Sequence, residues 1–289
     1  NEDILIEEKE NNTVLIKTSY SEFTIVGLEA DEFPNINDIE DDFATISFDT
    51  EIFKNMIRKT SFAASIDESK GIIVGVLMEI EPDGVNMVAL DGFRMAVARE
   101  EMKNTENRKI VVSAKILNEV NKIISEAEDE SDTKIMFSGK KAVIFAENTK
   151  IIIRLLEGEF IKYKDIIPTV NQTKVIIDRP ALLESIERAS LLAKEGKNNL
   201  IKLIIKNNLL TITSRSEEGN VIEELIMEKT GEDLEIGFNS KYVMDVLKAV
   251  DDEKILMEFN TSTTPCLVKP IEGDPFEYLI LPVRISSNY

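Results

Sequence analysis

Four segments of the chain share one pattern: a short run of β-forming residues, a capping residue and an amphipathic helix. They begin near residues 45, 109, 174 and 234, about 60 to 65 residues apart. In each segment a helix-capping residue stands between the strand and the helix. The side chain of such a residue accepts a hydrogen bond from a backbone N–H group of the first helical turn. These caps are Asp49 or Thr50, Ser113, Asp178 with Pro180 in the following turn, and Asn239. The pattern predicts helices that end near Thr60, Ser125, Leu192 and Val250.

Each predicted helix is followed by strands separated by turn residues such as Pro82-Asp83-Gly84 and Asn207-Asn208. Strands joined by such short turns form antiparallel meanders. The fold class is therefore α+β, with two strand–helix–strands modules making one larger unit. The strands are predicted at 72–80, 85–90 and 93–99, at 134–137, 142–146 and 151–156, at 200–205, 209–214 and 221–227, and at 254–259, 266–270 and 277–285.

The sequence also contains a second, longer repeat that spans two of these modules. Residues 57–64 (IRKTSFAA) resemble 186–193 (IERASLLA), and residues 114–122 (AKILNEVNK) resemble 240–248 (SKYVMDVLK). The larger unit is thus about 125 to 130 residues long, and we expect domains at 45–168 and 169–289. Residues 1–44 then form the C-terminal part of an earlier copy, because Phe23–Phe33 resembles Ile151–Phe160. A sheet fragment of this kind lacks half its core, so we expect roughly 80 residues to precede it in the complete protein.

Composition narrows the possible functions. The chain has no histidine and one cysteine, Cys266, which excludes His-based triads, His metal sites and thiolate zinc sites. A site built only from carboxylates stays open, since 54 residues are acidic. No run of apolar residues is long enough to span a membrane, and the single cysteine is typical of a cytoplasmic protein. We expect no cofactor, and a role in binding or scaffolding.

The net charge of −20 argues against broad nucleic-acid binding, so any contact with DNA needs a locally basic face. Such a face is predicted on the helices, because Lys115 and Lys122 recur as Lys241 and Lys248 at equivalent positions. The other two helices carry Lys54 and Arg58, and Arg179 and Arg188. The opposite helix faces carry the apolar residues Phe53, Ile57, Ile116, Val120, Ile186, Val243 and Leu247, which should pack on the sheets. The alternative is that the basic residues are ordinary solvated positions.

Three segments together resemble the β subunit of bacterial DNA polymerase III, the sliding clamp family. They are Val88–Val97 (VALDGFRMAV), Gly237–Leu247 (GFNSKYVMDVL) and Tyr278–Ile285 (YLILPVRI). The resemblance covers essentially the whole chain. It implies a head-to-tail homodimeric ring, with sheets outside and helices around duplex DNA, bound without regard to sequence. It also implies a non-catalytic processivity factor that tethers the polymerase catalytic subunit, the clamp loader and other proteins carrying a clamp-binding motif.

The resemblance also implies two sites. An apolar pocket for the partner motif would be formed by Ile73, Leu90, Gly92, Phe93, Arg94, Met95, Ile161, Ile166, Pro265, Leu279, Leu281, Pro282 and Val283. The dimer interface would contain Phe23, Leu191 and Leu192. Leu279, Leu281, Leu191 and Leu192 could instead be core residues. The sequence departs from the family at Ile161, Asp165, Gly71 and Ile72, which leaves the peptide preference and the DNA contact of the loop after Ser65–Lys70 open.

Two rival functions follow from the same residues. A hydrolase with a carboxylate-bound metal would need three or more acids converging at strand ends, and the repeat places no such cluster twice. A scaffold of the same fold that never holds DNA would not need a basic face. Charge reversal at the repeated lysines separates the scaffold from the clamp.

Overall fold

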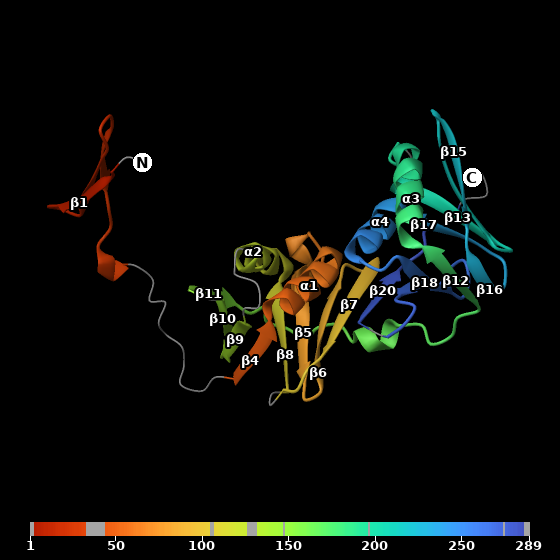
Figure 1. Ribbon diagram of the computed structural model, residues 1–289, viewed down its shortest axis with the longest axis horizontal. Coiled ribbons are helices and arrows are strands. Elements are labelled where there is room, and N and C mark those ends of the chain that lie inside the picture. Colours follow the sequence, from red (N-terminus) through yellow and green to blue (C-terminus); the bar gives the residue numbers. More distant parts are fainter. Residues whose placement is uncertain are drawn as a thin grey trace. The chain divides into compact units, whose positions relative to one another are not determined.

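The computed structural model describes residues 3–32, 44–104, 107–125, 132–146, 148–195, 197–273 and 275–285. It divides into two compact units, residues 1–41 and residues 42–289, which are described separately (Figure 1). No helix in the described part of the chain is long and apolar enough to cross a membrane.

The N-terminal unit is an antiparallel sheet in the order β1-β2-β3, followed by a 3-10 turn. Its elements are β1 (Leu5–Lys9), β2 (Thr13–Lys17), β3 (Glu22–Val26) and η1 (Ala30–Glu32). Within residues 3–32 only Leu15 is buried. A three-stranded sheet with both faces open has no core of its own. Phe33, at the end of the predicted repeat tail, lies outside the described residues.

The larger unit contains the four predicted strand–helix patterns and the strands that follow each helix. In chain order its first half consists of β4 (Ala44–Asp49), α1 (Thr50–Thr60), η2 (Ser61–Ala63), η3 (Glu68–Val74), β5 (Gly75–Glu81), β6 (Gly84–Leu90), β7 (Arg94–Glu101), β8 (Arg108–Ser113), α2 (Ala114–Ile124), β9 (Asp132–Ser138), β10 (Lys141–Ala146) and β11 (Thr149–Arg154). After η4 (Tyr163–Ile166) the second half consists of β12 (Thr173–Asp178), α3 (Arg179–Ala193), η5 (Lys197–Asn199), β13 (Leu200–Lys206), β14 (Leu209–Ser216), β15 (Gly219–Ile226), β16 (Glu228–Gly231), β17 (Leu234–Asn239), α4 (Ser240–Ala249), β18 (Lys254–Phe259), β19 (Cys266–Lys269) and β20 (Phe276–Ile280).

One sheet joins the two halves of this unit. It has the order β16-β12-β18-β19-β20-β7-β6-β5-β8, and the halves meet where β20 pairs antiparallel with β7, from Phe276 opposite Ala98 to Ile280 opposite Arg94. Each half also contains a four-stranded sheet, in the order β11-β10-β9-β4 in the first half and β15-β14-β13-β17 in the second. The two halves therefore share a continuous backbone ladder, and the predicted boundary at residue 168 stays a prediction.

The four helices lie on one side of the sheets, α1 beside α2 and α3 beside α4 (Figure 1). The predicted caps are confirmed in three helices, because Asp49, Asp178 and Asn239 accept backbone bonds of 2.8–3.1 Å from the first helical turn. Ser113 makes no such side-chain bond. The predicted apolar faces are buried in one core that runs through both halves, with Ile116 half-buried at its margin.

The predicted strands differ from the structure in three places, apart from shifts of one or two residues at other strand ends. Residues 72–74 belong to η3 and not to a strand, because Gly71, with a φ of 66°, bends the chain just before β5. The last strand ends at Ile280 and not at residue 285, since Pro282 has no N–H for a ladder. Strand β16 was not predicted; it pairs with β12 at the sheet edge.

Two buried tyrosines differ in whether their hydroxyl groups are hydrogen-bonded, and this difference provides a test of the packing. The Tyr163 hydroxyl donates a 2.7 Å hydrogen bond to Glu79, whereas that of Tyr278 has no partner among the described residues. We expect Tyr163→Phe to lower the free energy of unfolding by about 1–2 kcal/mol, because a buried acceptor loses its donor. Tyr278→Phe should leave it unchanged or raise it by up to about 1 kcal/mol, because an unpaired polar group is removed. Urea denaturation measures both, and equal losses would contradict this description.

Candidate functional site

The turn between β6 and β7 is built by Asp91. Its carboxylate accepts bonds from the backbone N–H groups of Phe93 at 2.8 Å and Arg94 at 3.0 Å. Gly92 supplies the positive φ of 93° that such a tight turn requires. As a result the Phe93 ring projects outward and is 58% exposed.

The C-terminal segment lies directly against this turn, as the resemblance predicts. Leu279 is the cross-strand partner of Met95, and the Leu281 N–H donates to the Phe93 carbonyl at 2.9 Å. The two leucines have different environments. Leu279 is buried at 3% exposure and Leu281 is 37% exposed, so Leu279 is a core residue and Leu281 faces solvent.

A third segment, residues 156–168, crosses the face of the sheet opposite the helices; we call it the strap. Its Phe160, Tyr163 and Ile167 pack into a small apolar cluster together with residues of β6, β7 and β20. Ile161 and Ile166 of the same strap are each 45% exposed. The strap thus carries two solvent-facing isoleucines on a segment anchored in the cluster that underlies the turn.

The predicted pocket residues therefore separate into two layers. Ile73, Leu90, Met95 and Leu279 belong to the apolar cluster. Four predicted pocket residues are exposed apolar side chains, each within two residues of a member of this cluster in the chain, and we call them the partner surface: Phe93, Ile161, Ile166 and Leu281. Gly92 is exposed beside Phe93, and Pro265, Pro282 and Val283 are half-buried.

Arg94 has a different environment from its neighbours. Its side chain is 9% exposed and binds Asp91 at 3.1 Å, Asp245 of α4 at 2.5 Å and the Phe62 carbonyl at 2.8 Å. The guanidinium also lies over the rings of Phe62 and Tyr242, at 5.4 and 4.7 Å. Arg94 therefore joins the two halves from the helix side, and its predicted contact with a partner stays a prediction.

Tyr242 is a site residue that the sequence analysis missed. It lies on α4, half-buried, and its ring stacks on Phe93 with a centroid distance of 6.1 Å. Position alone could have indicated it, because it falls inside the Gly237–Leu247 segment that carries the family resemblance. Through this contact the partner surface reaches the helix that also carries Lys241 and Lys248.

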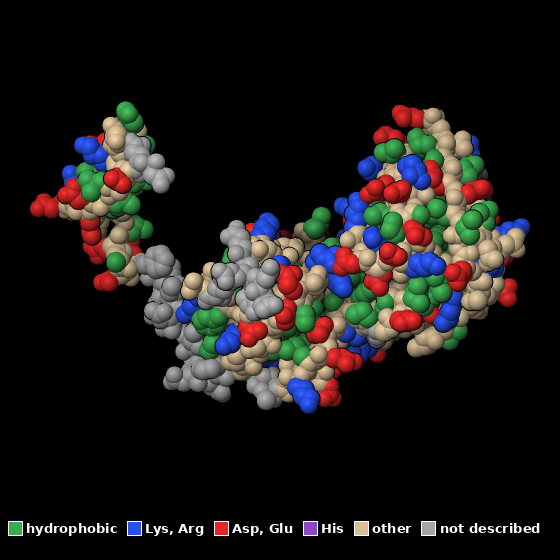
Figure 2. Space-filling model, viewed as in Figure 1, with side chains coloured by type: hydrophobic (Ala, Val, Ile, Leu, Met, Phe, Trp, Pro, Cys, Tyr) green, Lys and Arg blue, Asp and Glu red, His purple; other side chains and the backbone are tan. Residues whose placement is uncertain are grey.

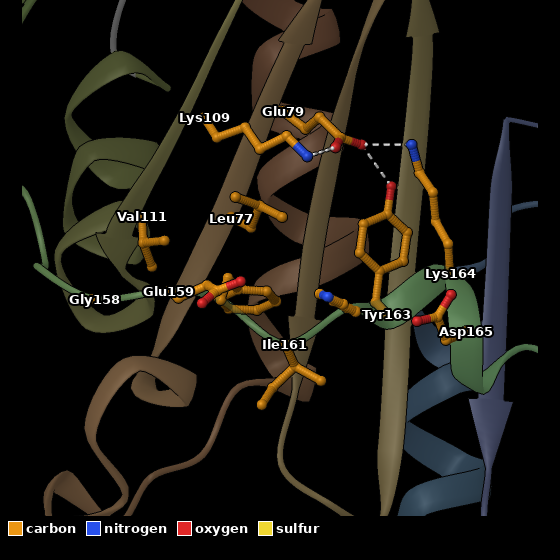
Figure 3. A pocket seen from close by; sticks show the side chains of 12 residues that line it. Leu77, Glu79, Lys109, Val111, Gly158, Glu159, Ile161, Tyr163, Lys164 and Asp165 are labelled. Atoms are coloured by element: carbon orange, nitrogen blue, oxygen red, sulfur yellow. Dashed lines mark hydrogen bonds and ion pairs between the residues drawn. The ribbon is translucent and has the colours of Figure 1, made fainter.

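A cavity of about 440 Å³ lies beside the strap (Figure 3). Its floor is formed by Leu77 and Val111 of the sheet, and Phe160 and Ile161 of the strap line it as well. At one end Glu79, 1% exposed, accepts from Asn86 at 3.3 Å and binds three groups more closely. They are Tyr163 at 2.7 Å, Lys109 at 2.6 Å and Lys164 at 3.1 Å.

The charge of Glu79 is set by these partners. Burial alone would raise the pKa of Glu79, but hydrogen bonds from Lys109, Tyr163 and Lys164 outweigh it and lower the pKa to about 2. The carboxylate is therefore ionised at neutral pH. Burial and then the bond to Glu79 raise the pKa of Tyr163, so its hydroxyl stays a donor.

The predicted DNA-facing residues lie on or at the ends of the four helices, but most are engaged in contacts within the chain. Of these predicted residues, Lys115 and Lys241 are exposed and make no ion pair with any described residue. Figure 2 shows basic and acidic side chains intermingled on the visible face and no solid basic field. The pairs within α1 and α2 and between α3 and α4 are Lys54 with Glu51, Lys122 with Glu119 at 2.9 Å, and Lys248 with Glu187 at 2.8 Å.

The three arginines hold elements together. Arg58 donates to the Ala249 carbonyl at 3.2 Å and pairs with Asp251. Arg179 donates to the Leu247 carbonyl at 3.2 Å and to that of Asp252 at 2.7 Å. Both therefore bind carbonyl groups at the C-terminal end of α4, where a cation is favourable.

Arg188 binds both carboxylate oxygens of Glu223 on β15, at 2.7 and 3.0 Å. The strand that it holds, β15, is the edge of its sheet.

The predicted interface residues are exposed to different degrees. Phe23 on β3 is 59% exposed and Leu191 on α3 is 66% exposed, whereas Leu192 is half-buried. Strand β15 adds two residues that the sequence analysis missed, Ile222 and Ile226, at 61% and 86% exposure. An open edge strand with exposed apolar residues is a surface for pairing with another chain.

In the described residues no group of three or more acidic or cysteine side chains is arranged to hold a metal ion.

Comparison with known proteins identifies the family. Residues 47–162 match the family described as DNA polymerase III beta subunit, central domain, and residues 164–284 match its C-terminal domain. The chain is 35% identical over 285 residues to the beta sliding clamp of Staphylococcus epidermidis and, equally, to that of Staphylococcus aureus, covering 98% of this chain and 75% of each relative.

Solved structures agree. The DNA polymerase sliding clamp from Bacillus subtilis superposes with a TM-score of 0.92 at 32% identity, covering 98% of this chain and 75% of that one. A putative DNA polymerase III beta subunit from Eubacterium rectale gives 0.91 at 33% identity, covering 97% and 76%. The predicted fold class is confirmed, and the chain belongs to the DNA polymerase III beta subunit family of sliding clamps.

Proposed function

We propose that this chain acts as the sliding clamp of a bacterial replicative DNA polymerase, a processivity factor that catalyses no reaction of its own. Membership of the clamp family supports this function. In our proposal the protein encircles duplex DNA as a homodimeric ring and tethers the polymerase catalytic subunit, the clamp loader and other motif-bearing proteins. Residues 1–44, 45–168 and 169–289 are its successive domains, and it works in the cytoplasm.

The observation that carries the proposal is the partner surface. Phe93 and Leu281 come from segments almost 190 residues apart, yet a backbone hydrogen bond joins them, and both side chains stay exposed. Exposed apolar anchors over a buried apolar floor are what a short extended peptide needs for binding. We propose that the surface receives such a peptide from the polymerase and from the clamp loader.

The ring is proposed from a second group of exposed residues. Phe23 of one copy would meet Leu191 and Leu192 of another, beside the open edge strand β15. Ile222 and Ile226 would extend that contact. The apolar side chains would then be covered in the dimer, as interfaces of this kind require.

One observation favours the scaffold alternative. Six of the eight basic residues proposed to face DNA bind groups of the chain itself: Lys54, Arg58, Lys122, Arg179, Arg188 and Lys248. Surface pairs between neighbouring turns of a helix are weak, so phosphates could replace their acidic partners. The arginines that hold α4 are less available. We therefore assign the main phosphate contacts to Lys115 and Lys241.

Substitution of the partner surface tests the peptide site. The probe is a fluorescein-labelled peptide of the clamp-binding type Gln-Leu-x-Leu-Phe, with the sequence Gln-Leu-Ser-Leu-Phe. We expect Phe93→Ala and Leu281→Ala each to weaken its binding at least about tenfold, because each removes an exposed anchor. Fluorescence anisotropy measures the affinity. The matched control is Leu209→Ala on β14, where a leucine of 38% exposure lies outside the surface. Arg94 is left unchanged, since its loss would disturb the junction of the halves. Equal affinity in all variants would refute this site.

Charge reversal tests the DNA contact. The double variant Lys115→Glu, Lys241→Glu should weaken binding to a labelled duplex at low salt, and the slope of log affinity against log salt should fall by about 2. The control is Lys134→Glu, Lys141→Glu, which makes the same charge change on strands β9 and β10. If both variants bind duplex DNA alike, the helices do not contact DNA, and the scaffold function is favoured.

A further inference from the structure

In the described residues, the polar contacts of the strap lie at its start, where Glu157 also pairs with Lys140 of the β9–β10 turn at 2.8 Å, and in its middle. The Leu156 N–H donates to the Val111 carbonyl at 2.8 Å, near the start of the strap. In its middle the side-chain contacts with the sheet are made by Tyr163 and Lys164, and they converge on Glu79, with a longer contact from Lys164 to Glu81 at 3.7 Å. Figure 3 shows Tyr163 and Lys164 directed toward Glu79 from one side and Lys109 from the other.

Glu79 occupies a position that favours an apolar residue. It lies within β5 on the same face as Leu77, and it is 1% exposed. A buried carboxylate is costly unless its oxygens are paired and hydrogen-bonded. Here both oxygens are used: one binds Lys109, and the other accepts from Tyr163, Lys164 and Asn86, the last at 3.3 Å. Since an apolar residue would avoid this cost, the carboxylate serves to fix the groups that bind it.

Apolar packing alone does not fix the strap. The 440 Å³ cavity is lined by Phe160 and Ile161 of the strap and by Leu77 and Val111 of the sheet, so the strap is not close-packed on the sheet along its whole length. Apolar contacts are non-directional and allow a segment to shift, whereas a short hydrogen bond has a preferred distance and angle. The bond from Tyr163 to Glu79 is therefore the contact that sets the position of the strap.

The same bond sets the position of the partner surface. The Tyr163 N–H donates to the Ile161 carbonyl at 2.8 Å, and η4 links Tyr163 to Ile166 within one turn. A displacement of Tyr163 therefore moves both isoleucines relative to Phe93 and Leu281. Those two are fixed independently, by the β7–β20 pairing and the bond between them.

We propose that Glu79 and Tyr163 are positioning residues of the peptide site. By anchoring the strap they hold Ile161 and Ile166 in place before a partner binds, so that one peptide contacts them together with Phe93 and Leu281. Neither residue needs to touch the peptide. The inference rests on the proposed peptide-binding function. Its physical basis is that a surface ordered in advance binds without the entropy cost of ordering a loose segment.

The test compares Glu79→Gln, Tyr163→Phe and their double variant in the full chain, with Gln-Leu-Ser-Leu-Phe as the probe. Each single variant should weaken peptide binding about three- to tenfold, and the double variant should weaken it by clearly less than the product, because both remove one contact. Backbone amides of residues 157–167 should exchange hydrogen faster in all three variants.

Matched controls separate positioning from general loss of stability. Glu258→Gln removes a buried carboxylate, 5% exposed, that pairs with Lys174 and Lys269 within the second half, on the same face of the sheet but away from the β7–β20 pairing. Tyr278→Phe removes a buried hydroxyl that is not bound to Glu79. Both controls should keep wild-type affinity and strap exchange, whatever their melting temperatures.

Two results overturn the inference. The first is unchanged affinity in the Glu79 and Tyr163 variants while the strap exchanges faster. The second is an equal loss of affinity in the controls. A failure of the proposed function is distinct from both, because the wild-type chain itself would then not bind the probe.

Discussion

The pairing of β7 with β20 is the constraint on which the rest of the larger unit depends. It brings together segments that are far apart in the chain, with Ile280 opposite Arg94, and makes the two halves one nine-stranded sheet. The turn at Asp91–Arg94 enters β7 and the segment from Leu281 leaves β20, so both lie at the end of this pairing. The partner surface exists only because the pairing is formed. Arg94 strengthens it from the helix side, by linking the turn to Asp245 of α4.

A row of polar side chains crosses the same junction on the opposite face of the sheet. Glu258 pairs with Lys174 at 2.8 Å, and Lys269 lies between Glu258 and Glu277 at 3.4 and 3.1 Å. Glu277 in turn pairs with Arg99 of β7 at 2.8 Å. Burial opposes ionisation of Glu258, but the bonds from Lys174 and the charge of Lys269 lower its pKa. Because alternate charges occupy neighbouring strands, a shift of one half against the other would break several pairs together.

Much of this fold was accessible from the sequence because the repeat carries redundant signals. Caps such as Asp178 and apolar faces such as that containing Val243 and Leu247 predicted the helices within one or two residues. The chain between the elements was harder. The break before β5 depends on the positive φ of Gly71, and the early end of β20 depends on Pro282 and on a bond made by Leu281. Such features depend on local geometry that periodicity does not describe.

The candidate site was predicted as a set of residues, but their individual roles required the structure. Strand alternation could have shown that Arg94 and Met95 face opposite sides of the sheet, yet not that Asp245 lies below Arg94. Likewise the sequence did not show which of Leu279 and Leu281 is buried, because that depends on their cross-strand partners. The acidic partners of Arg58 and Arg188 are 193 and 35 residues away, and no pattern within a single helix predicts them.

The central claim is that a partner peptide binds across the junction of the two halves. The most direct measurement is a crystal structure of the chain with the Gln-Leu-Ser-Leu-Phe peptide bound. We predict that the peptide contacts Phe93 and Leu281 together and lies against Ile161 or Ile166, with the strap unmoved. A peptide seated wholly on one half, or away from the β7–β20 pairing, would contradict it.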